Sequence, residues 1–244
     1  MSEQQINRFA SVNHGLINRR TAHKLGLTDR QIAYRVSQSR WSRLWPTVFA
    51  ISGSAHTPAQ TLLGAVMHSD GVASHLSAAW LLGLRDLPPA LPQVSTAPGG
   101  GRSSQAIKIH QSRDLHVGHT TNVNRIRTTD ATRTILDLAG QISCTELQIL
   151  FDRALRFRLT HADKLTEYFL QTSRSGRPGA AALRRFLKGM NLDLALAESD
   201  LVLASWRVLR FTWRQICYQS DWVVGQVREA LELGSSYRSA IQPA

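Results

Sequence analysis

Long side chains that donate hydrogen bonds gather in one short segment near the N-terminus. Helical spacing over Asp29–Ser37 separates them from Ile32, Ala33 and Val36, which we expect to be buried. Arginine, glutamine and tyrosine at such positions can reach phosphates and base edges in a major groove. The residues that we predict to contact DNA, on this helix and on the strand after it, are Thr28, Arg30, Gln31, Tyr34, Arg35, Gln38, Arg40 and Arg43.

The elements that must position these side chains are a helix-turn-helix and a wing. The sequence predicts a first helix over Arg19–Leu25 and a left-handed corner at Gly26. Thr28 is expected to cap the second helix, with Gln31 completing a capping box. The strand-forming run from Trp45 to Ile51 then favours a hairpin beside the recognition helix.

The charge of this segment agrees with a polyanionic partner. Residues 1–50 hold eight Lys or Arg and two acidic residues, so they carry +6 of the formal net charge of +12. A basic patch on a compact helical unit is typical of nucleic-acid binding. Two other interpretations remain open, an ordinary three-helix subdomain with a solvated cationic face and a second helix that docks on protein.

Length and composition indicate a cytoplasmic protein of about two domains. The chain has 244 residues, of which 43% are hydrophobic, and its N-terminus MSEQQINRF is too polar for a signal peptide. The two cysteines, Cys144 and Cys217, form no C-x-x-C pair, which suits a reducing compartment. No apolar run is long enough to cross a bilayer, so we expect no membrane partner.

The rest of the chain predicts an α+β fold. Strands are expected over Gln93–Ala97 and Ala106–Gln111, paired through a turn at Gly99–Ser104, and over Val123–Arg127 with Ile126 inward. Thr129 is expected to cap a helix. The predicted helices, which surround and follow these strands, are Met1–Ala10, Thr57–Met67, Ser74–Leu84, Ala131–Ala139, Cys144–Phe157, His161–Leu170, Ala180–Lys188, Leu192–Ala204 and Asp221–Leu233.

Other candidate chemistry is weak, and we expect no metal, no cofactor and no catalytic residue. His110, His116 and His119 lie near one another but lack a cysteine partner or an H-E-x-x-H spacing, so surface histidines explain them better than zinc. Ser74 and His75 are adjacent at a helix start, where neighbours do not face each other, and Ser74 is expected to cap that helix. The glycines at 99–101 lack a following G-K-[ST] and cradle no phosphate.

Three segments in order resemble the AbiEi family of bacterial type IV antitoxins. They are RWSRLWPTVFAI, SHLSAAWLLGL and RTTDATRTILDLAG, and the resemblance covers about residues 12–188. It implies a winged-helix domain joined to an α/β antitoxin domain. Family members bind inverted repeats in their own promoter, repress it and counter a nucleotidyltransferase-like toxin. In that scheme Thr28, Arg30, Gln31, Tyr34 and Arg35 belong to the recognition helix, and Arg40 and Arg43 to the wing.

The C-terminal part resembles the end of a Vsr-like PD-(D/E)XK endonuclease domain, on the run WRVLRFTW and the helix after it. Such nucleases hold Mg²⁺ with carboxylates on two strands. The acids before this run, Asp193, Glu198 and Asp200, follow a helical pattern instead, so we expect a remnant without catalysis.

The expected domains follow from these two resemblances. They are a winged helix over residues 1–53, an antitoxin-like domain over 54–188, the nuclease-like remnant over 189–234 and a flexible tail over 235–244. The expected function is a DNA-binding repressor of its own promoter, acting on double-stranded operator DNA. Two alternatives stay open, a Mg-dependent endonuclease and a toxin-neutralising protein with secondary DNA binding.

Overall fold

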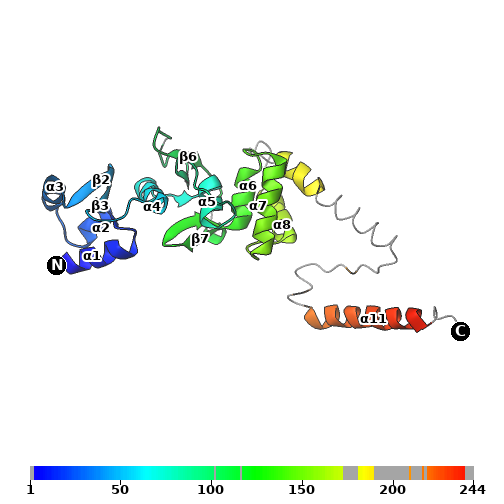
Figure 1. Ribbon diagram of the computed structural model, residues 1–244. Helices are drawn as coiled ribbons and strands as arrows, with labels where there is room; N and C mark the ends of the chain where they lie inside the picture. The colour runs from blue at the N-terminus through cyan, green and yellow to red at the C-terminus, as the bar shows by residue number, and fades with distance from the viewer. Residues whose placement is uncertain are drawn as a thin grey trace. The chain divides into compact units, whose positions relative to one another are not determined.

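The computed structural model describes residues 3–101, 103–115, 117–172, 181–189, 209, 216 and 219–239. The fold is α+β, and its contacts divide the chain into two compact units, residues 1–160 and 161–244 (Figure 1). The expected boundaries after residues 53, 188 and 234 stay a prediction. Within the described ranges, no helix combines the length and the apolarity needed to cross a membrane.

The first unit begins with a helix-turn-helix and a hairpin. Its elements are α1 (Glu3–Val12), β1 (Leu16–Asn18), α2 (Arg19–Lys24), α3 (Asp29–Ser37), β2 (Trp41–Trp45) and β3 (Val48–Ile51). The strands form an antiparallel sheet in the order β1-β3-β2, in which β1, absent from our prediction, pairs Leu16 with Ala50. This order of helices and strands is that of a winged helix-turn-helix.

Local signals set the helix ends in this part. The Thr28 hydroxyl accepts from the Gln31 backbone N–H, and the Gln31 side chain accepts from the Thr28 N–H, which confirms the predicted capping box. Gly26 has a φ of 82°, so the corner is left-handed as expected. Beneath the helices lies a small core whose buried members are Ile6, Ile17, Ala22, Leu27, Ile32, Trp41 and Phe49.

A five-stranded mixed sheet occupies the rest of the first unit, in the order β6-β5-β4-β8-β7. Its strands are β4 (Val72–Ala73), β5 (Gln93–Thr96), β6 (Lys108–Gln111), β7 (Thr120–Val123) and β8 (Ile126–Thr129). The other elements are α4 (Pro58–Ser69), α5 (His75–Leu81), the short helix η1 (Val117–His119), α6 (Ala131–Leu138) and α7 (Cys144–Arg156).

The strand pairing corrects two of our predictions. β5 and β6 are parallel neighbours, with Gln93 opposite Lys108, and not a hairpin. The connection over residues 97–107 is long enough to return the chain to the same end of the sheet, which parallel pairing requires. The predicted single strand over Val123–Arg127 is interrupted by the turn of the β7–β8 hairpin, because Asn124 and Arg125 both have positive φ. Ile126 lies in β8 and is buried, as expected.

Three expectations about helices also change. Asp130, and not Thr129, caps α6 by accepting from the Arg133 backbone N–H. Leu155, expected on the buried face of α7, is 38% exposed. Ser74 holds the N-cap position of α5, but its hydroxyl makes no capping hydrogen bond.

Helix α4 joins the two sheets of the first unit through one apolar core. Leu16, Val48 and Ala50 of the winged helix belong to the same buried cluster as Leu62 of α4 and Val94 of β5. Gly64 allows this close approach, because a Cβ there would lie 2.7 Å from Nε1 of Trp45. The winged helix therefore packs directly on the element that covers the larger sheet.

The second unit contains α8 (Ala162–Thr172), a helical segment over residues 181–189 and α11 (Ser220–Ser239). Leu165, Tyr168 and Phe169 of α8 are buried. α11 continues to Ser239, past the predicted helix end at Leu233. The glycine at position 234 does not end the helix, because a glycine within a helix costs only about 1 kcal/mol.

Several predictions lie outside the described residues. They are the helix Leu192–Ala204, most of the strand-like run WRVLRFTW and the acids Asp193, Glu198 and Asp200.

Candidate nucleic-acid interface

The outward face of α3 carries two of the side chains predicted to contact DNA, Arg30 and Tyr34. Arg30, Ala33, Tyr34 and Ser37 follow one another at helical spacing along this face, and all are exposed. The Tyr34 residue is 59% exposed, which is unusual for a large aromatic. Gln38 is exposed just beyond the helix end. The predicted burial of Ala33 is wrong, since Ile32 alone among the residues of α3 is fully buried.

Arg35 does not lie on this face, contrary to our prediction. Its side chain is only 14% exposed, and Nη2 is 3.0 Å from the Glu3 carboxylate of α1. The guanidinium also lies 5.6 Å from the ring centroid of Trp41, within the range of a cation–π contact. An arginine can bury its aliphatic stem while its charge finds a partner, so Arg35 joins α3 to α1 and to the wing.

Thr28 and Gln31 are exposed at the N-terminus of α3, but the capping box uses part of their hydrogen-bonding capacity. The Gln31 Oε1 is 2.9 Å from the Thr28 backbone nitrogen. Its amide nitrogen remains a possible donor to an incoming group. The N-terminus of a helix also carries a partial positive charge that favours phosphate.

The wing supplies two more exposed cations. The Arg40 side chain is 64% exposed and lies 4.0 Å from Glu3 Oε1, at the limit of an ion pair. Arg43 is exposed, and its guanidinium lies 5.9 Å from the Phe49 ring centroid. Trp41 between them is only 4% exposed, so it packs in the core and does not accompany the cations at the surface.

Further positive charge flanks these elements. Arg8 of α1 and Arg20 and Lys24 of α2 are exposed. Asp29 is 3.6 Å from Arg19 and 3.2 Å from the His23 ring, so the acid at the start of α3 faces two basic groups. The surface of the winged helix is therefore strongly cationic, and both of its acids contact cations.

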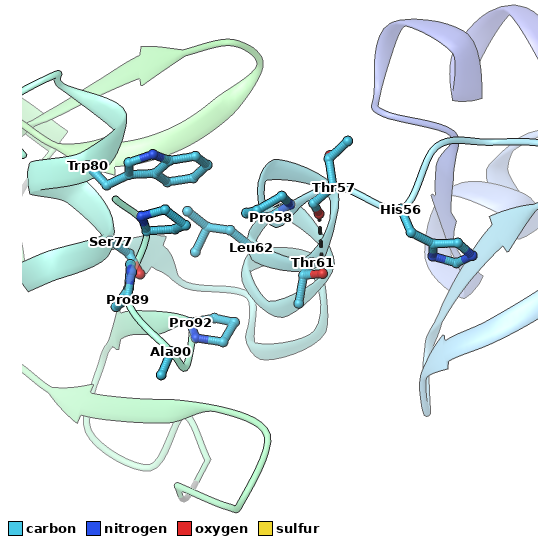
Figure 2. Close-up of a pocket in the computed structure, with 11 residues that line it drawn as sticks. His56, Thr57, Pro58, Thr61, Leu62, Ser77, Trp80, Pro89, Ala90 and Pro92 are labelled. Atoms are coloured by element: carbon cyan, nitrogen blue, oxygen red, sulfur yellow. Dashed lines mark hydrogen bonds between the residues drawn. The ribbon is translucent and has the colours of Figure 1, made fainter. Parts of the chain in front are cut away.

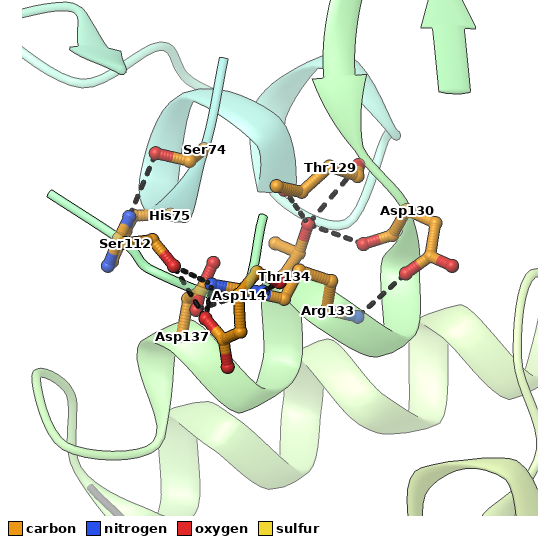
Figure 3. Close-up of polar contacts among 9 residues, drawn as sticks. All are labelled: Ser74, His75, Ser112, Asp114, Thr129, Asp130, Arg133, Thr134 and Asp137. Atoms are coloured by element: carbon orange, nitrogen blue, oxygen red, sulfur yellow. Dashed lines mark hydrogen bonds and ion pairs between the residues drawn. The ribbon is translucent and has the colours of Figure 1, made fainter. Parts of the chain in front are cut away.

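A second polar cluster, missed by sequence reasoning, lies buried in the larger sheet region (Figure 3). Arg133 of α6 is 2% exposed and donates to Oδ1 of Asp137 at 2.8 Å and to Oγ of Ser112 at 2.8 Å. It also donates to the Asp114 backbone carbonyl at 2.9 Å and to its carboxylate at 3.3 Å. These bonds hold the segment after β6 against α6, so the role of Arg133 is structural.

Ser74 and His75 contact each other, contrary to our expectation for adjacent residues. His75 has a φ of 53°, and this left-handed start of α5 brings its Nδ1 to 2.9 Å from Ser74 Oγ. Its ring stacks on His110 with centroids 3.6 Å apart. Burial lowers the pKa of His75 to about 2, with smaller effects of His110, Arg133 and Lys108. Burial, with a smaller effect of Lys108, lowers the pKa of His110 to about 4, so both rings are neutral at pH 7.

This serine–histidine pair is closed to a substrate. The residues Ser74 and His75 are 0% and 6% exposed, so a nucleophilic role has no access route. In the part of the chain that the structure describes, no three His, Cys, Asp or Glu side chains are grouped to hold a metal ion. His116 lies outside the described residues.

Comparison with known proteins adds no relative to this picture. No protein-family model matches the chain, and no curated protein matches it.

Proposed function

We propose that the protein is a sequence-specific DNA-binding regulator of the type IV antitoxin kind, which represses its own promoter in the cytoplasm. The observation that supports this most is the exposed face of α3 with Arg30 and Tyr34, together with the exposed wing cations Arg40 and Arg43. A recognition helix in the major groove needs such a face, and a wing needs cations for the phosphate backbone.

Electrostatics supports the same proposal. The exposed cations Arg8, Arg20 and Lys24 surround the helix-turn-helix. Neutralising each phosphate releases counterions, so the logarithm of the affinity falls with the logarithm of salt by about 0.9 per contact. Four to six such contacts, an order-of-magnitude estimate, would lower the affinity roughly a hundredfold to a thousandfold between 50 and 200 mM salt.

The test is fluorescence anisotropy of the full-length chain with its own upstream DNA and with a scrambled duplex. Tight, sequence-selective binding that falls steeply with salt is expected. Arg30→Ala should weaken binding to the upstream DNA by about 1–3 kcal/mol and reduce the preference over the scrambled duplex.

Arg156→Ala is the matched control, because it removes an equal charge from an exposed position on α7. An equal loss of DNA affinity in both variants would mean that Arg30 contributes only through the net charge of the protein. Equal affinity for both duplexes would reject sequence-specific regulation. Mg²⁺-dependent nicking of the DNA would favour the endonuclease alternative instead.

A second candidate function, binding of a toxin-like protein, is favoured by an apolar surface on α7. Ile149 of α7 is 51% exposed and Leu87 is 71% exposed, and both line a depression of about 360 Å³. Arg153 pairs with Asp86 at its edge, at 2.9 Å. A nucleotidyltransferase-like protein that co-purifies with the wild type and not with Ile149→Glu, while DNA binding is unchanged, would support this role.

A further inference from the structure

A pocket of about 330 Å³ opens between α4, α5 and the proline-rich loop over residues 88–92 (Figure 2). Figure 2 shows the Trp80 ring extending from α5 toward Leu62 of α4, with Ala90 and Pro92 of the loop beneath. Its volume lies at the lower end of the range of small-molecule sites, roughly 300–1,000 Å³. The pocket belongs to the first unit and is separate from the exposed face of α3.

The walls of this pocket are held in place before any ligand arrives. The Thr57 hydroxyl accepts from the Gln60 backbone N–H at 3.1 Å, and the Ser77 hydroxyl accepts from the Gln93 backbone N–H at 2.9 Å. Four of the lining residues are prolines, whose fixed φ leaves little backbone freedom to lose. A preorganised wall lowers the entropic cost of binding.

The lining chemistry selects the class of ligand. No Asp, Glu, Lys or Arg lines the pocket, and its one ionisable lining residue, His56, is exposed. A charged ligand would therefore lose hydration without gaining a buried opposite charge. The Trp80 face offers stacking to a ring, while Leu62 and the prolines offer apolar contact. We infer that this pocket binds a small, uncharged, flat aromatic molecule of one or two rings.

The position of the pocket couples it to the winged helix. Thr57 lies at the end of the segment that joins β3 to α4. One turn further into the helix, the buried Gln60 donates to the His14 carbonyl at 2.8 Å and to Ser54 Oγ at 3.1 Å. A ligand against this first turn of α4 would contact the same turn that holds the winged helix. The regulatory part of the inference, altered operator affinity with ligand bound, rests on the proposed DNA-binding function.

Isothermal titration calorimetry of the full-length chain with indole tests the binding part without DNA. Saturable binding of one indole per chain is expected, with indole-3-carboxylate weaker by about tenfold or more because its charge has no partner. Trp80→Leu should weaken indole binding by a similar factor. Because loss of that ring also removes packing, Ala90→Phe provides a second variant, which narrows the pocket from the exposed loop.

Leu91→Phe is the matched control, since Leu91 is 39% exposed on the same loop and does not line the pocket. It should bind indole like the wild type. Absence of saturable indole binding, equal binding of the carboxylate, or unchanged binding in Ala90→Phe would overturn the assignment. Binding of a proline-rich peptide in place of indole would also overturn it.

Operator titrations with and without saturating indole test the coupling. A change in operator affinity of about threefold or more, lost in Ala90→Phe, is expected if the ligand acts through the first turn of α4. Indole binding without any change would reject the coupling alone. Indole binding by a chain that binds no DNA would reject the proposed function and leave the pocket assignment standing.

Discussion

Acidification should destabilise the first unit through His75. The ring is 6% exposed, stacks on His110 at 3.6 Å and faces the positive charges of Lys108 and Arg133. Its pKa falls from 6.5 to about 2 on folding, mainly because burial disfavours the charged ring. In the unfolded chain, His75 therefore becomes protonated near pH 6.5, whereas in the folded chain it stays neutral to a much lower pH.

The sign and size of the effect follow from this difference. Below pH 6.5 the unfolded state holds more protons, so the free energy of unfolding falls as pH falls. Each pH unit below 6.5 lowers the free energy of unfolding by about 1.4 kcal/mol. At pH 5, His75 alone therefore lowers it by about 2 kcal/mol. At pH 7 this contribution is essentially absent. His110 acts in the same direction, because its pKa is also lowered by burial.

Urea denaturation of the wild type and of His75→Asn at pH 7 and pH 5, followed by tryptophan fluorescence, measures this contribution. Asparagine adopts left-handed backbone more readily than most residues and can keep a hydrogen bond to Ser74 Oγ, so the variant removes the titration at modest structural cost. The wild type should lose about 2 kcal/mol more than the variant on acidification. His56→Asn, at an exposed histidine, should behave like the wild type. An equal loss in wild type and His75→Asn would refute the reasoning.

Two further predictions concern the winged helix. Glu3→Gln removes the carboxylate that lies 3.0 Å from Arg35 and 4.0 Å from Arg40. The variant should bind DNA more tightly by roughly 0.5–1 kcal/mol, with a steeper salt dependence, as measured by anisotropy. Unchanged affinity would contradict this prediction. Gly64→Ala places a Cβ 2.7 Å from Trp45 Nε1 and should lower the free energy of unfolding by about 1–3 kcal/mol in urea titrations. Gly118→Ala is the control, because a Cβ there would have no atom within 4 Å, and it should have little effect. Similar changes in the two variants would argue against tight packing at α4.

Signals carried by neighbouring residues allowed the helix-turn-helix to be predicted in detail. Thr28 and Gln31 form their capping box within four residues, and Gly26 adopts positive φ without help from distant parts of the chain. Side-chain partners from elsewhere were not predictable in this way. Helical spacing alone does not reveal that Trp41 and Glu3 draw Arg35 away from the exposed face.

The larger sheet shows the limit of local patterns. The sequence pattern predicted the strands β5 and β6, but whether two strands pair parallel depends on the path of the connection between them. The burial of Arg133 could not be predicted from local patterns either, because its partners at positions 112 and 114 come from another segment. An arginine in a sequence normally indicates a solvated surface.

The shared apolar core has a consequence for any attempt to excise the N-terminal fifty residues. Leu16, Val48 and Ala50 are at most 1% exposed and pack in the same cluster as Leu62 and Leu63 of α4. Cutting the chain at the connection between β3 and α4 would expose these side chains to water, at about 1.5–3 kcal/mol for each of the two larger ones. Helix α3 and its hairpin therefore cannot be moved to another protein alone, and grafting them would require carrying the first turns of α4 with them.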